Sequence, residues 1–325
     1  MSRDVEIQFG ALRIFAVVAE SKTLTDAANR LGITQSAVSQ AVAQLEEITA
    51  TSLLVRRSRP IKLTPSGQTL NVHAKKILAD TRQMLAAVQQ DSDAGLSNLN
   101  IGFIDSFGDA VGPQIVDKLE FAAARISLHT GFNSPLSEAF IQRDLDLLIT
   151  SDPMLEHPEL ERHAILKDPF LMLVPDRFVT SETPLVQQLA AEVPFVRYTR
   201  LSRIGALTDL VTRRLNVSPS TRYEFDSTQT LMRFVQAGRG WAIATGLCIV
   251  QFPALLEGVH VLPLGGGDNA RHISLVARPD ELGTLPEKVA SLCREIYVDD
   301  VLPRTVDLAP WLKNYAGTRV DVPLN

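Results

Sequence analysis

The stretch LGITQSAVSQAVAQLEE, residues 31–47, has apolar residues at helical spacing on one face and almost no charge on the other. The inward positions are Val38, Ala41, Val42 and Leu45, and the outward ones are Gln35, Ser36, Ser39 and Gln40. The first acidic residue of the stretch is Glu46. Because the outer face of a globular protein's helix usually carries charged residues, this uncharged face indicates a role beyond solubility.

The residues before this stretch predict two further short helices. One apolar stripe consists of Leu12, Phe15, Ala16 and Ala19. Thr23 and Asp26 have the spacing of a capping box, and Gly32 occupies a position suited to a left-handed C-cap. Thr34 is placed to cap the helix that follows. Three short helices with a glycine turn between the last two predict a helix-turn-helix unit.

The segment LLVRRSRPIKLT, residues 53–64, is strand-like at both ends with Arg-Pro in its middle, which predicts a two-stranded hairpin or wing. A long helix then starts at Thr64 or Ser66 and continues to about Asp91. Its apolar positions lie near heptad spacing: Leu70, Ala74, Ile77, Leu78, Met84, Leu85 and Val88. Because a single helix cannot bury such a seam, we expect it to pair with its copy in a dimer.

Beyond Asn98 strand patterns alternate with helical ones, which predicts a parallel α/β sheet. The expected strands are LNIGFI (99–104), ISLHTG (126–131), LDLLIT (145–150), FLMLVP (170–175), PFVRY (194–198), GWAIAT (240–245) and HISLVARP (272–279). Helices are expected over residues 112–124 and 228–237. About 200 residues with this alternation fit either one doubly wound domain or two small ones, and the pattern alone does not choose between them.

Composition excludes several classes of protein. The 325 residues are 45% hydrophobic, and their pattern predicts neither a membrane-spanning stretch nor a secretory leader, so a cytoplasmic globular protein is expected. The net charge of −5 divides into +2 over residues 1–67 and −7 over the rest. Cys248 and Cys293 lack metal or redox spacing and are expected to be buried thiols. The six histidines show no paired ligand spacing, so no metal and no cofactor are expected.

The first 67 residues resemble the LysR-type transcriptional regulators, in register over most of that length. The match rests on Leu12 and Phe15, on TLTDAANRLGITQSAVSQAVAQLEE (23–47), on Arg56, and on LTPSG (63–67). Three positions depart from the family's pattern: Thr49, Ala50 and Leu54. Ala50 stands where a glycine is usual, so a turn with positive φ must be made by a residue that is strained there. Weaker similarity continues through LNIGFIDS (99–106), DLDLLIT (144–150) and RFVQAGRGWAIAT (233–245).

The resemblance implies an α/β protein with an all-α N-terminal head. Residues 1–67 would form a winged helix-turn-helix domain and residues 68–94 a linker and dimerisation helix. Residues 95–302 would form a two-lobed α/β effector-binding domain similar to periplasmic binding proteins, followed by a tail over 303–325. Lobe I would take residues 95–166 and 270–302, and lobe II residues 167–269, with crossings near 164–170 and 266–272.

Two groups of side chains in the head are candidates for contact with DNA. The base-reading group is Thr34, Gln35, Ser36, Ser39 and Gln40, because Gln bonds bidentately to adenine and Ser bonds several base edges in the major groove. The phosphate-binding group is Arg56, Arg57, Arg59 and Lys62 on the wing. The alternatives are a solvated polar face on a small helical bundle and a basic loop that merely increases solubility.

The candidate effector site lies where strands end, because open α/β sheets bind ligands there. The candidates are Ser106, Thr130, Tyr198, Ser202 and Thr228. Hydroxyls and helix N-termini suit an anionic group, whereas Asp105 beside Ser106 favours an amine or a hydroxyl. The expected ligand is therefore a small polar metabolite.

The resemblance implies three further kinds of partner: double-stranded DNA with an interrupted inverted repeat, a second copy of the chain in a dimer or tetramer, and RNA polymerase. No membrane partner is expected. One alternative function is a ligand-binding module whose helical head docks protein instead of DNA. Another is an enzyme built on the α/β region, but the sequence contains no GxSxG elbow, dinucleotide fingerprint or metal cluster.

Overall fold

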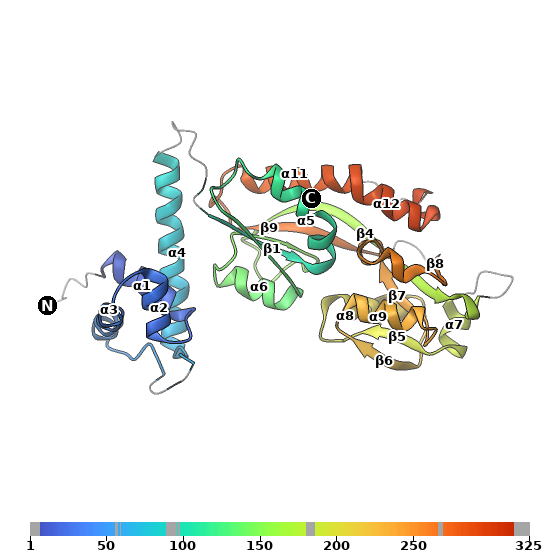
Figure 1. The fold of residues 1–325 in the computed structure, drawn as a ribbon, viewed down its shortest axis with the longest axis horizontal. Helices are drawn as coiled ribbons and strands as arrows, with labels where there is room; N and C mark the ends of the chain where they lie inside the picture. The colour runs from blue at the N-terminus through green and yellow to red at the C-terminus, as the bar shows by residue number, and fades with distance from the viewer. Residues whose placement is uncertain are drawn as a thin grey trace. The chain divides into compact units, whose positions relative to one another are not determined.

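The computed structural model describes residues 7–55, 58, 60–88, 96, 98–179, 186–265 and 269–314. It contains two compact units, Met1–Ala94 with Ile141–Asp144, and Gly95–Phe140 with Leu145–Asn325. We call the first the head unit and the second the α/β unit (Figure 1). Within the described ranges, no helix combines the length and the apolarity required to cross a membrane.

The described residues of the head unit form four α-helices before the linker to the α/β unit. They are α1 (Phe9–Ala19), α2 (Leu24–Leu31), α3 (Gln35–Thr49) and α4 (Pro65–Val88). Phe15 of α1 and Val38 and Leu45 of α3 are fully buried at its centre. The predicted inward face of α3 is confirmed, since Val38, Ala41, Val42 and Leu45 are all buried.

The turns between these helices follow the predicted chemistry. The side chain of Thr23 accepts a hydrogen bond from the N–H of Asp26 at 3.0 Å, and Asp26 Oδ2 accepts the N–H of Lys22 at 3.0 Å. Gly32 ends α2 at φ 66°, and the Thr34 hydroxyl accepts a backbone N–H in the first turn of α3. The predicted helix-turn-helix is therefore confirmed.

The turn after α3 uses two specific devices. Ala50 has φ 50°, so the chain makes a left-handed C-cap without glycine, as its departure from the family pattern indicated. Glu46 Oε1 then accepts the N–H of Leu53 at 2.7 Å, and this bond anchors the segment that follows. Gly67 packs against the same residue so closely that a Cβ there would lie 2.1 Å from the Leu53 carbonyl oxygen.

The predicted wing is less regular than a two-stranded hairpin. In the described residues its pairing is a single antiparallel bridge between Leu54 and Leu63. The N–H of Val55 also donates to the carbonyl of Lys62 at 2.8 Å. Arg56, Arg57 and Arg59 lie outside the described residues.

The long helix starts as expected, and two described residues of its apolar seam are exposed. Thr64 accepts the N–H of Gly67 at 3.0 Å, and α4 begins at Pro65. Ala74 is buried in the head's own core, whereas Ile77 and Met84 are 44% and 56% exposed. Among the seam residues whose side chains are described, Ala74 is therefore covered by the folded chain, whereas Ile77 and Met84 are not.

The α/β unit contains nine strands, with helices between most of them. The strands are β1 (Leu99–Ile104), β2 (Ile126–Gly131), β3 (Leu147–Thr150), β4 (Glu161–Pro175), β5 (Phe195–Tyr198), β6 (Thr221–Phe225), β7 (Ala242–Thr245), β8 (Val259–Pro263) and β9 (Ala270–Ala277). The α-helices are α5 (Asp105–Lys118), α6 (Asn133–Ile141), α7 (Val186–Glu192), α8 (Arg203–Arg214), α9 (Thr228–Gln236), α10 (Gly246–Gln251), α11 (Leu285–Ile296) and α12 (Leu302–Leu308). Short helical turns cover Asp176–Phe178, Pro253–Leu256, Tyr297–Val301 and Pro310–Asn314. These counts refer to the described residues.

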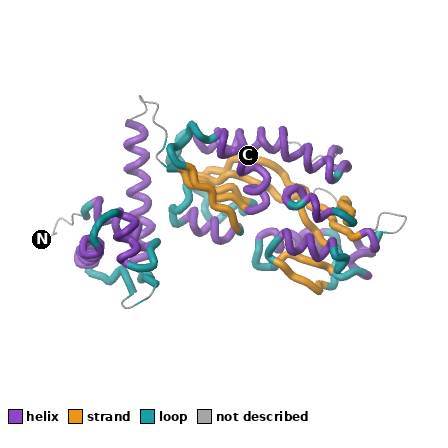
Figure 2. Tube along the Cα trace, in the orientation of Figure 1, coloured by secondary structure: helices purple, strands orange, loops and turns teal. Residues whose placement is uncertain are grey.

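Two long strands, β4 and β9, join two lobes in one sheet with the order β2-β1-β3-β9-β4-β7, and β8 also pairs with β4 (Figures 1 and 2). β4 pairs with β9 up to Pro169, and from Phe170 onward it pairs with β7 and β8. Because β4 changes partners there, it crosses from lobe I to lobe II inside the segment predicted for the first crossing. The two-lobed α/β architecture is confirmed.

Each lobe has its own buried core. In lobe I, α5 and α11 cover one face of the sheet and α6 the other (Figure 1). Lobe II adds the parallel pair β5–β6, which joins the end of the sheet through a bridge between Phe195 and Trp241. Trp241 and Tyr198 are among its largest fully buried side chains.

The helix expected over residues 112–124 instead spans Asp105–Lys118, so this prediction is wrong at both ends. The helix contains two glycines, Gly108 and Gly112. Gly108 is required for packing, since a Cβ there would lie 2.8 Å from Cγ2 of Thr130. Pro113 lies inside the helix.

The sequence patterns missed β6, β8 and the first half of β4. β6 (TRYEF) is partly exposed and rich in charge, and β8 (VHVLP) is partly buried and ends in proline. The segment assigned to a C-terminal tail, from residue 303 on, packs instead against lobe II through residue 314. Leu312 is fully buried there, and Trp311 Nε1 donates to the carbonyl of Val261 at 3.1 Å.

Candidate functional site

The first candidate site is the outer face of α3. Its predicted residues, Thr34, Gln35, Ser36, Ser39 and Gln40, are all exposed. They lie at the N-cap and in the first two turns, so they share one end of the helix. The Thr34 and Ser36 hydroxyls lie 3.0 Å apart. This surface therefore offers amides and hydroxyls that can exchange hydrogen bonds with base edges, without a charge to bind phosphate indiscriminately.

The phosphate-binding group is described only at Lys62. Lys62 is exposed, and its carbonyl is held by the N–H of Val55 on the opposite arm of the wing. The predicted wing arginines, at positions 56, 57 and 59, lie outside the described residues.

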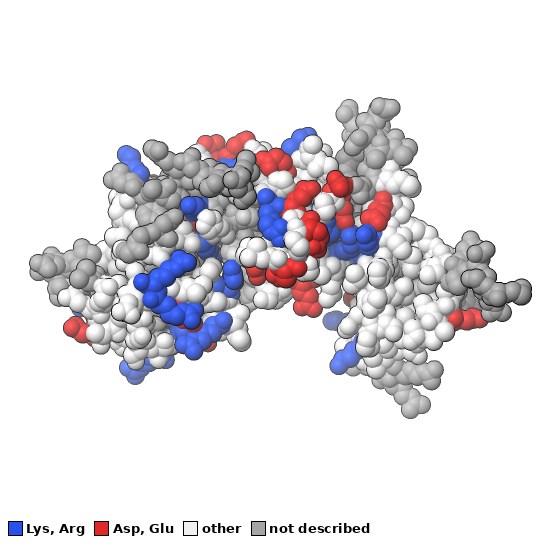
Figure 3. Space-filling model, turned by 180° about the vertical axis from the view of Figure 1, so that it is seen from behind, with Lys and Arg blue, Asp and Glu red and all other residues white. Residues whose placement is uncertain are grey.

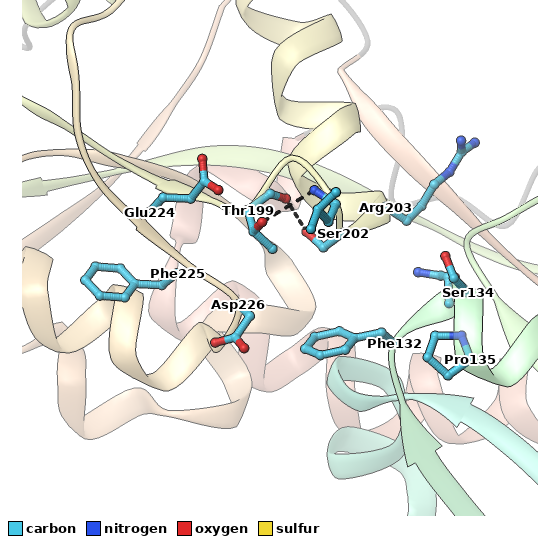
Figure 4. Close-up of a pocket in the computed structure, with 11 residues that line it drawn as sticks. Phe132, Ser134, Pro135, Thr199, Ser202, Arg203, Glu224, Phe225 and Asp226 are labelled. Atoms are coloured by element: carbon cyan, nitrogen blue, oxygen red, sulfur yellow. Dashed lines mark hydrogen bonds between the residues drawn. The ribbon is translucent and has the colours of Figure 1, made fainter.

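The second candidate site is the space between the two lobes. Two neighbouring cavities of about 530 and 280 Å³ share Phe132 and Asn133 from lobe I and Ser202, Arg203 and Asp226 from lobe II. We call them together the cleft. Figure 4 shows the larger cavity, with Phe132 and Pro135 on one side and Phe225 and Asp226 on the other. Such volumes suit a small metabolite.

The floor of the cleft is a buried ion pair that joins both lobes. Arg271 of β9 is paired with Asp168 of β4 at 2.8 Å, and both are at least 95% buried. Arg271 also donates to Ser106 of α5 at 2.7 Å and to Thr245 of β7 at 3.1 Å. Burial is the largest single influence and would lower the pKa of Arg271, but the charge and hydrogen bond of Asp168 act together with Cys248 and Tyr198, and the pKa is raised. Arg271 therefore stays a cation.

A second buried cluster lies beside this pair. The Tyr198 hydroxyl lies 3.2 Å from Thr228 Oγ1 and 3.5 Å from Cys248 Sγ. Thr245 also reaches Cys248 Sγ at 3.3 Å. Burial, followed by the neighbouring Cys248, raises the pKa of Tyr198 well above its ordinary value. Tyr198 is therefore a neutral hydrogen-bonding group beneath the cleft.

The cleft contains four of the five predicted effector residues. Ser106, Tyr198, Ser202 and Thr228 all line its smaller cavity, although they come from distant parts of the chain. Ser202 is the N-cap of α8, and its hydroxyl accepts the N–H of Gly205 at 3.1 Å. Thr130 lines neither cavity of the cleft; it is exposed and packs against Gly108.

Asp105 contributes a negative charge to the same cavity. It is the first residue of α5, one residue before Ser106. Burial, with the nearby charge of Asp109, raises the pKa of the Asp105 carboxyl. Gln251 donates to Asp109 Oδ2 at 2.6 Å. The cleft therefore offers hydroxyls, a buried cation already paired with Asp168, and a carboxylate near its rim.

Sequence reasoning missed the floor of the cleft. Arg271 and Asp168 are 103 residues apart and belong to strands whose pairing no local pattern reveals. A charged residue within an apolar strand pattern was the one available signal, and DPFLMLVP and ARHISLVA both contain it. Phe132 of the cleft wall carried no signal at all.

The two cysteines are buried free thiols, as predicted. Burial raises the pKa of Cys293 to about 12, so this thiol is not a nucleophile at neutral pH.

Two family models match the chain in the order of its two units. Residues 9–68 match the "Bacterial regulatory helix-turn-helix protein, lysR family" and residues 94–296 match the "LysR substrate binding domain". The chain belongs to the LysR family. The family is one of transcriptional regulators and not of enzymes.

Curated relatives match over most of their length. A probable cat1 operon transcriptional activator of Acinetobacter lwoffii is 27% identical over 88% of this chain and 95% of its own. The transcriptional regulator PcaQ of Agrobacterium fabrum is 24% identical over 87% of this chain and 92% of its own. Both names describe regulators of transcription.

Solved structures share the fold of this LysR-family protein. A full-length OxyR variant from Pseudomonas aeruginosa aligns with a TM-score of 0.75 at 19% identity, covering 91% of this chain and 96% of that one. ArgP from Mycobacterium tuberculosis aligns with a TM-score of 0.65 at 17% identity, covering 88% and 96%. At these identities the likeness concerns the fold alone.

Proposed function

We propose that the protein reads promoter DNA with α3 and that a small polar metabolite bound in the cleft regulates this binding in the cytoplasm. The observation that carries the proposal is the exposed, uncharged face from Thr34 to Gln40, held by a buried apolar face on the same helix. Placed in a major groove with its N-terminal end first, this face brings amides and hydroxyls to base edges. The Vibrio fischeri DarR structure, solved in complex with DNA, has a TM-score of 0.50 to this chain and supports the same assignment.

The reading helix and the wing would divide the work of binding. Gln35 and Ser39 would select sequence, whereas Lys62 and the three wing arginines would hold phosphates without selecting it. Affinity would therefore fall steeply with salt, and discrimination would depend on the neutral residues.

The test compares two single variants on the DNA sequence that the wild-type protein selects from a random pool, with random DNA as reference. Gln35→Ala removes one bidentate base contact, so the ratio of specific to random affinity should fall roughly tenfold, for a contact of about 1–3 kcal/mol. Lys62→Ala should weaken both affinities similarly and lower the salt slope by about one. An unchanged ratio in Gln35→Ala would show that α3 does not read bases.

Pairing of two heads would extend this function to an interrupted inverted repeat. An apolar cavity of about 700 Å³ in the head unit is lined by residues from α1 and α4, including Phe9, Leu70 and Ile77. Phe9 is 45% exposed and Ile77 is 44% exposed, which supports burial against a second copy. Analytical ultracentrifugation of Ile77→Asp should then give a weaker dimer, and the selected DNA should lose its second half-site.

The effector half of the proposal rests on the cleft. Ser106, Tyr198, Ser202 and Thr228 come from both lobes, so a ligand bound among them would favour one separation of the lobes. Thermal-shift measurements with a panel of polar metabolites should find ligands that raise the melting temperature of wild type but not of Ser202→Leu. RNA polymerase would be the partner that responds to the change.

The alternative is a ligand-binding module whose head docks a protein. This alternative predicts that the protein binds DNA weakly and with the same affinity whatever its sequence. The DNA selection described above separates the two, because a protein-docking head enriches no sequence.

A further inference from the structure

Among the described residues, the C-terminal helices form a third connection between the lobes, besides β4 and β9. We call residues 297–314 the strap; it consists of the helical turn Tyr297–Val301, α12 and the turn Pro310–Asn314. It follows α11 directly, and Figure 1 shows α11 over the sheet of lobe I and α12 extending from it toward β8 of lobe II. The match to the substrate binding domain ends at residue 296, so the strap lies outside the part of the chain that the family model covers.

The first end of the strap is fixed to lobe I. Tyr297 and Val301 are buried in the core of that lobe. Asp300 Oδ2 accepts a hydrogen bond from Nε2 of Gln114 on α5 at 3.0 Å. The same oxygen pairs with Arg304, one turn further along the strap, at 3.0 Å. Apolar and polar contacts therefore hold this end together.

The second end of the strap is fixed to lobe II. Ala309 and Leu312 are 1% and 0% exposed, and they belong to the core that contains Tyr198. Trp311 Nε1 donates a hydrogen bond to the carbonyl of Val261 on β8 at 3.1 Å. Because a buried leucine and a hydrogen-bonded indole are both lost if this end detaches, it is a firm anchor.

Between its two ends the strap packs against α10, which also lines the cleft. A Cβ on Gly246, the first residue of α10, would lie 3.1 Å from Cγ2 of Thr305 on α12 and 3.1 Å from Oδ1 of Asp168. That oxygen of Asp168 accepts the N–H of Leu247 at 3.0 Å, and Cys248 lines the smaller cavity of the cleft. The floor of the cleft and the strap therefore hold the same short helix.

The strap adds a restraint that the two long strands do not supply. Two neighbouring strands can still twist together, so β4 and β9 alone leave the lobes one way to reorient. The strap is helical and does not belong to the sheet, and an α-helix cannot lengthen without breaking its backbone hydrogen bonds. Movement of the lobes therefore requires the strap to bend or one of its ends to detach.

We propose that the strap sets the resting separation of the two lobes, with α10 as its contact to the cleft. The point of bending is the turn Tyr297–Val301, which is π-helical, and such turns inside α-helices are sites where helices kink. A ligand that moves the lobes would work against the strap. This last step rests on the function proposed for the cleft, whereas the effect of the strap on lobe separation does not.

The test measures the distance between the lobes in the unliganded full chain by pulsed electron paramagnetic resonance. Spin labels are attached at Glu120→Cys in lobe I and Arg213→Cys in lobe II, both exposed positions, whereas the two native cysteines are buried. Residues 170–265 contain nine arginines, and Figure 3 shows basic side chains gathered over lobe II at the left of that view, so replacing one changes this surface little. An excess of unlabelled chain removes distances between copies.

Two truncations make a matched pair. A chain that ends at Leu308 loses the anchor in lobe II, whereas a chain that ends at Asn314 loses only residues 315–325, which lie outside the described residues. The distance distribution should shift and broaden in the first and match wild type in the second. Hydrogen exchange is a second readout, since the amides of α10 should exchange roughly tenfold faster in the first truncation alone.

A second matched pair tests the end in lobe I. Asp300→Ala removes the acceptor of the Gln114 hydrogen bond, whereas Asp299→Ala removes its exposed neighbour. The first should broaden the distance distribution, although less than truncation at Leu308, and the second should leave it unchanged.

A full-length double variant, Trp311→Ala with Leu312→Ala, tests the anchor in lobe II without shortening the chain. It should broaden the distribution as the truncation at Leu308 does. The proposal is overturned if these two variants fold and keep the wild-type distribution, if the two truncations change it equally, or if Asp299→Ala and Asp300→Ala broaden it equally. If neither variant without the anchor folds, the comparison of Asp300→Ala with Asp299→Ala decides.

Discussion

The outer face of α3 and the floor of the cleft present polar groups in opposite ways, one exposed and uncharged, the other buried and charged. On α3, five uncharged side chains from one helix lie in water and make few contacts with the protein. In the floor of the cleft, Arg271 and Asp168 are almost completely buried and bind each other and two hydroxyls. The first surface has free hydrogen-bonding groups but little effect on stability, whereas the second joins two lobes and is expensive to disturb.

The largest effect is therefore expected at the floor of the cleft. Arg271→Met leaves the Asp168 carboxylate buried without its partner, which should destabilise the α/β unit by about 3–5 kcal/mol. Urea denaturation followed by circular dichroism measures it. Arg213→Ala is the control, because that arginine is exposed and its loss should change stability by less than about 0.5 kcal/mol. A loss below about 1 kcal/mol in Arg271→Met would contradict the role assigned to the pair.

At the N-cap of α3, loss of the capping hydroxyl should lower the free energy of unfolding by about 1 kcal/mol. Thr34→Ala removes the hydroxyl that accepts the first-turn N–H of α3, and such substitutions typically cost this amount. Thr34→Ser keeps the acceptor and should retain most of the stability. Denaturation of the full chain, followed by circular dichroism, compares the two variants with wild type. Equal losses in both would show that the hydroxyl of residue 34 does not stabilise the helix.

A stabilising change is expected at the C-cap of the same helix. Ala50 has φ 50°, a conformation that glycine adopts without strain. Ala50→Gly should therefore stabilise the head by roughly 0.5–1 kcal/mol after the entropic cost of glycine. Ala43→Gly on the exposed side of α3 is the matched control and should destabilise by a similar amount. If both glycines destabilise, the positive φ of Ala50 carries no strain.

The sequence alone predicts the exposed face of α3 but not the floor of the cleft. Thr23, Gly32 and Thr34 act through contacts within a few residues, so spacing alone located the turn and the exposed face. The Arg271–Asp168 pair depends on which strands are neighbours in the sheet, and no local pattern contains that information. Between these limits, Ser202 and Thr130 were both proposed because they follow strands. Ser202 caps α8 and lines the cleft, whereas Thr130 lies outside it.

The smallest expected effect concerns the rim of the cleft. The folded-state pKa of Asp105 is raised above its unfolded value, so the folded state binds the proton more tightly. Stability from this group is then present at low pH and is lost as pH rises through the raised pKa. Because Asp105 is more than a third exposed, Asp105→Asn should stabilise the protein at pH 7 by only a few tenths of a kcal/mol. The difference from wild type should vanish below the unfolded pKa of Asp, about 3.9. Parallel thermal melts across this range measure it, and a stabilisation that grows on acidification would contradict the sign.

The ladder between β4 and β9 sets what kind of movement the lobes can make. Eight residue pairs join these strands from Glu161–Ala277 to Pro169–Ala270, with an irregularity at Ile165. Since both strands continue as hydrogen-bonded sheet up to the crossing, the lobes can reorient only by twisting the ladder, and a bulge is where twist concentrates. The β4–β9 ladder therefore resists twisting and favours one angle between the lobes. A ligand of the kind proposed for the cleft would have to twist this ladder away from its preferred angle, and the angle would return when the ligand leaves.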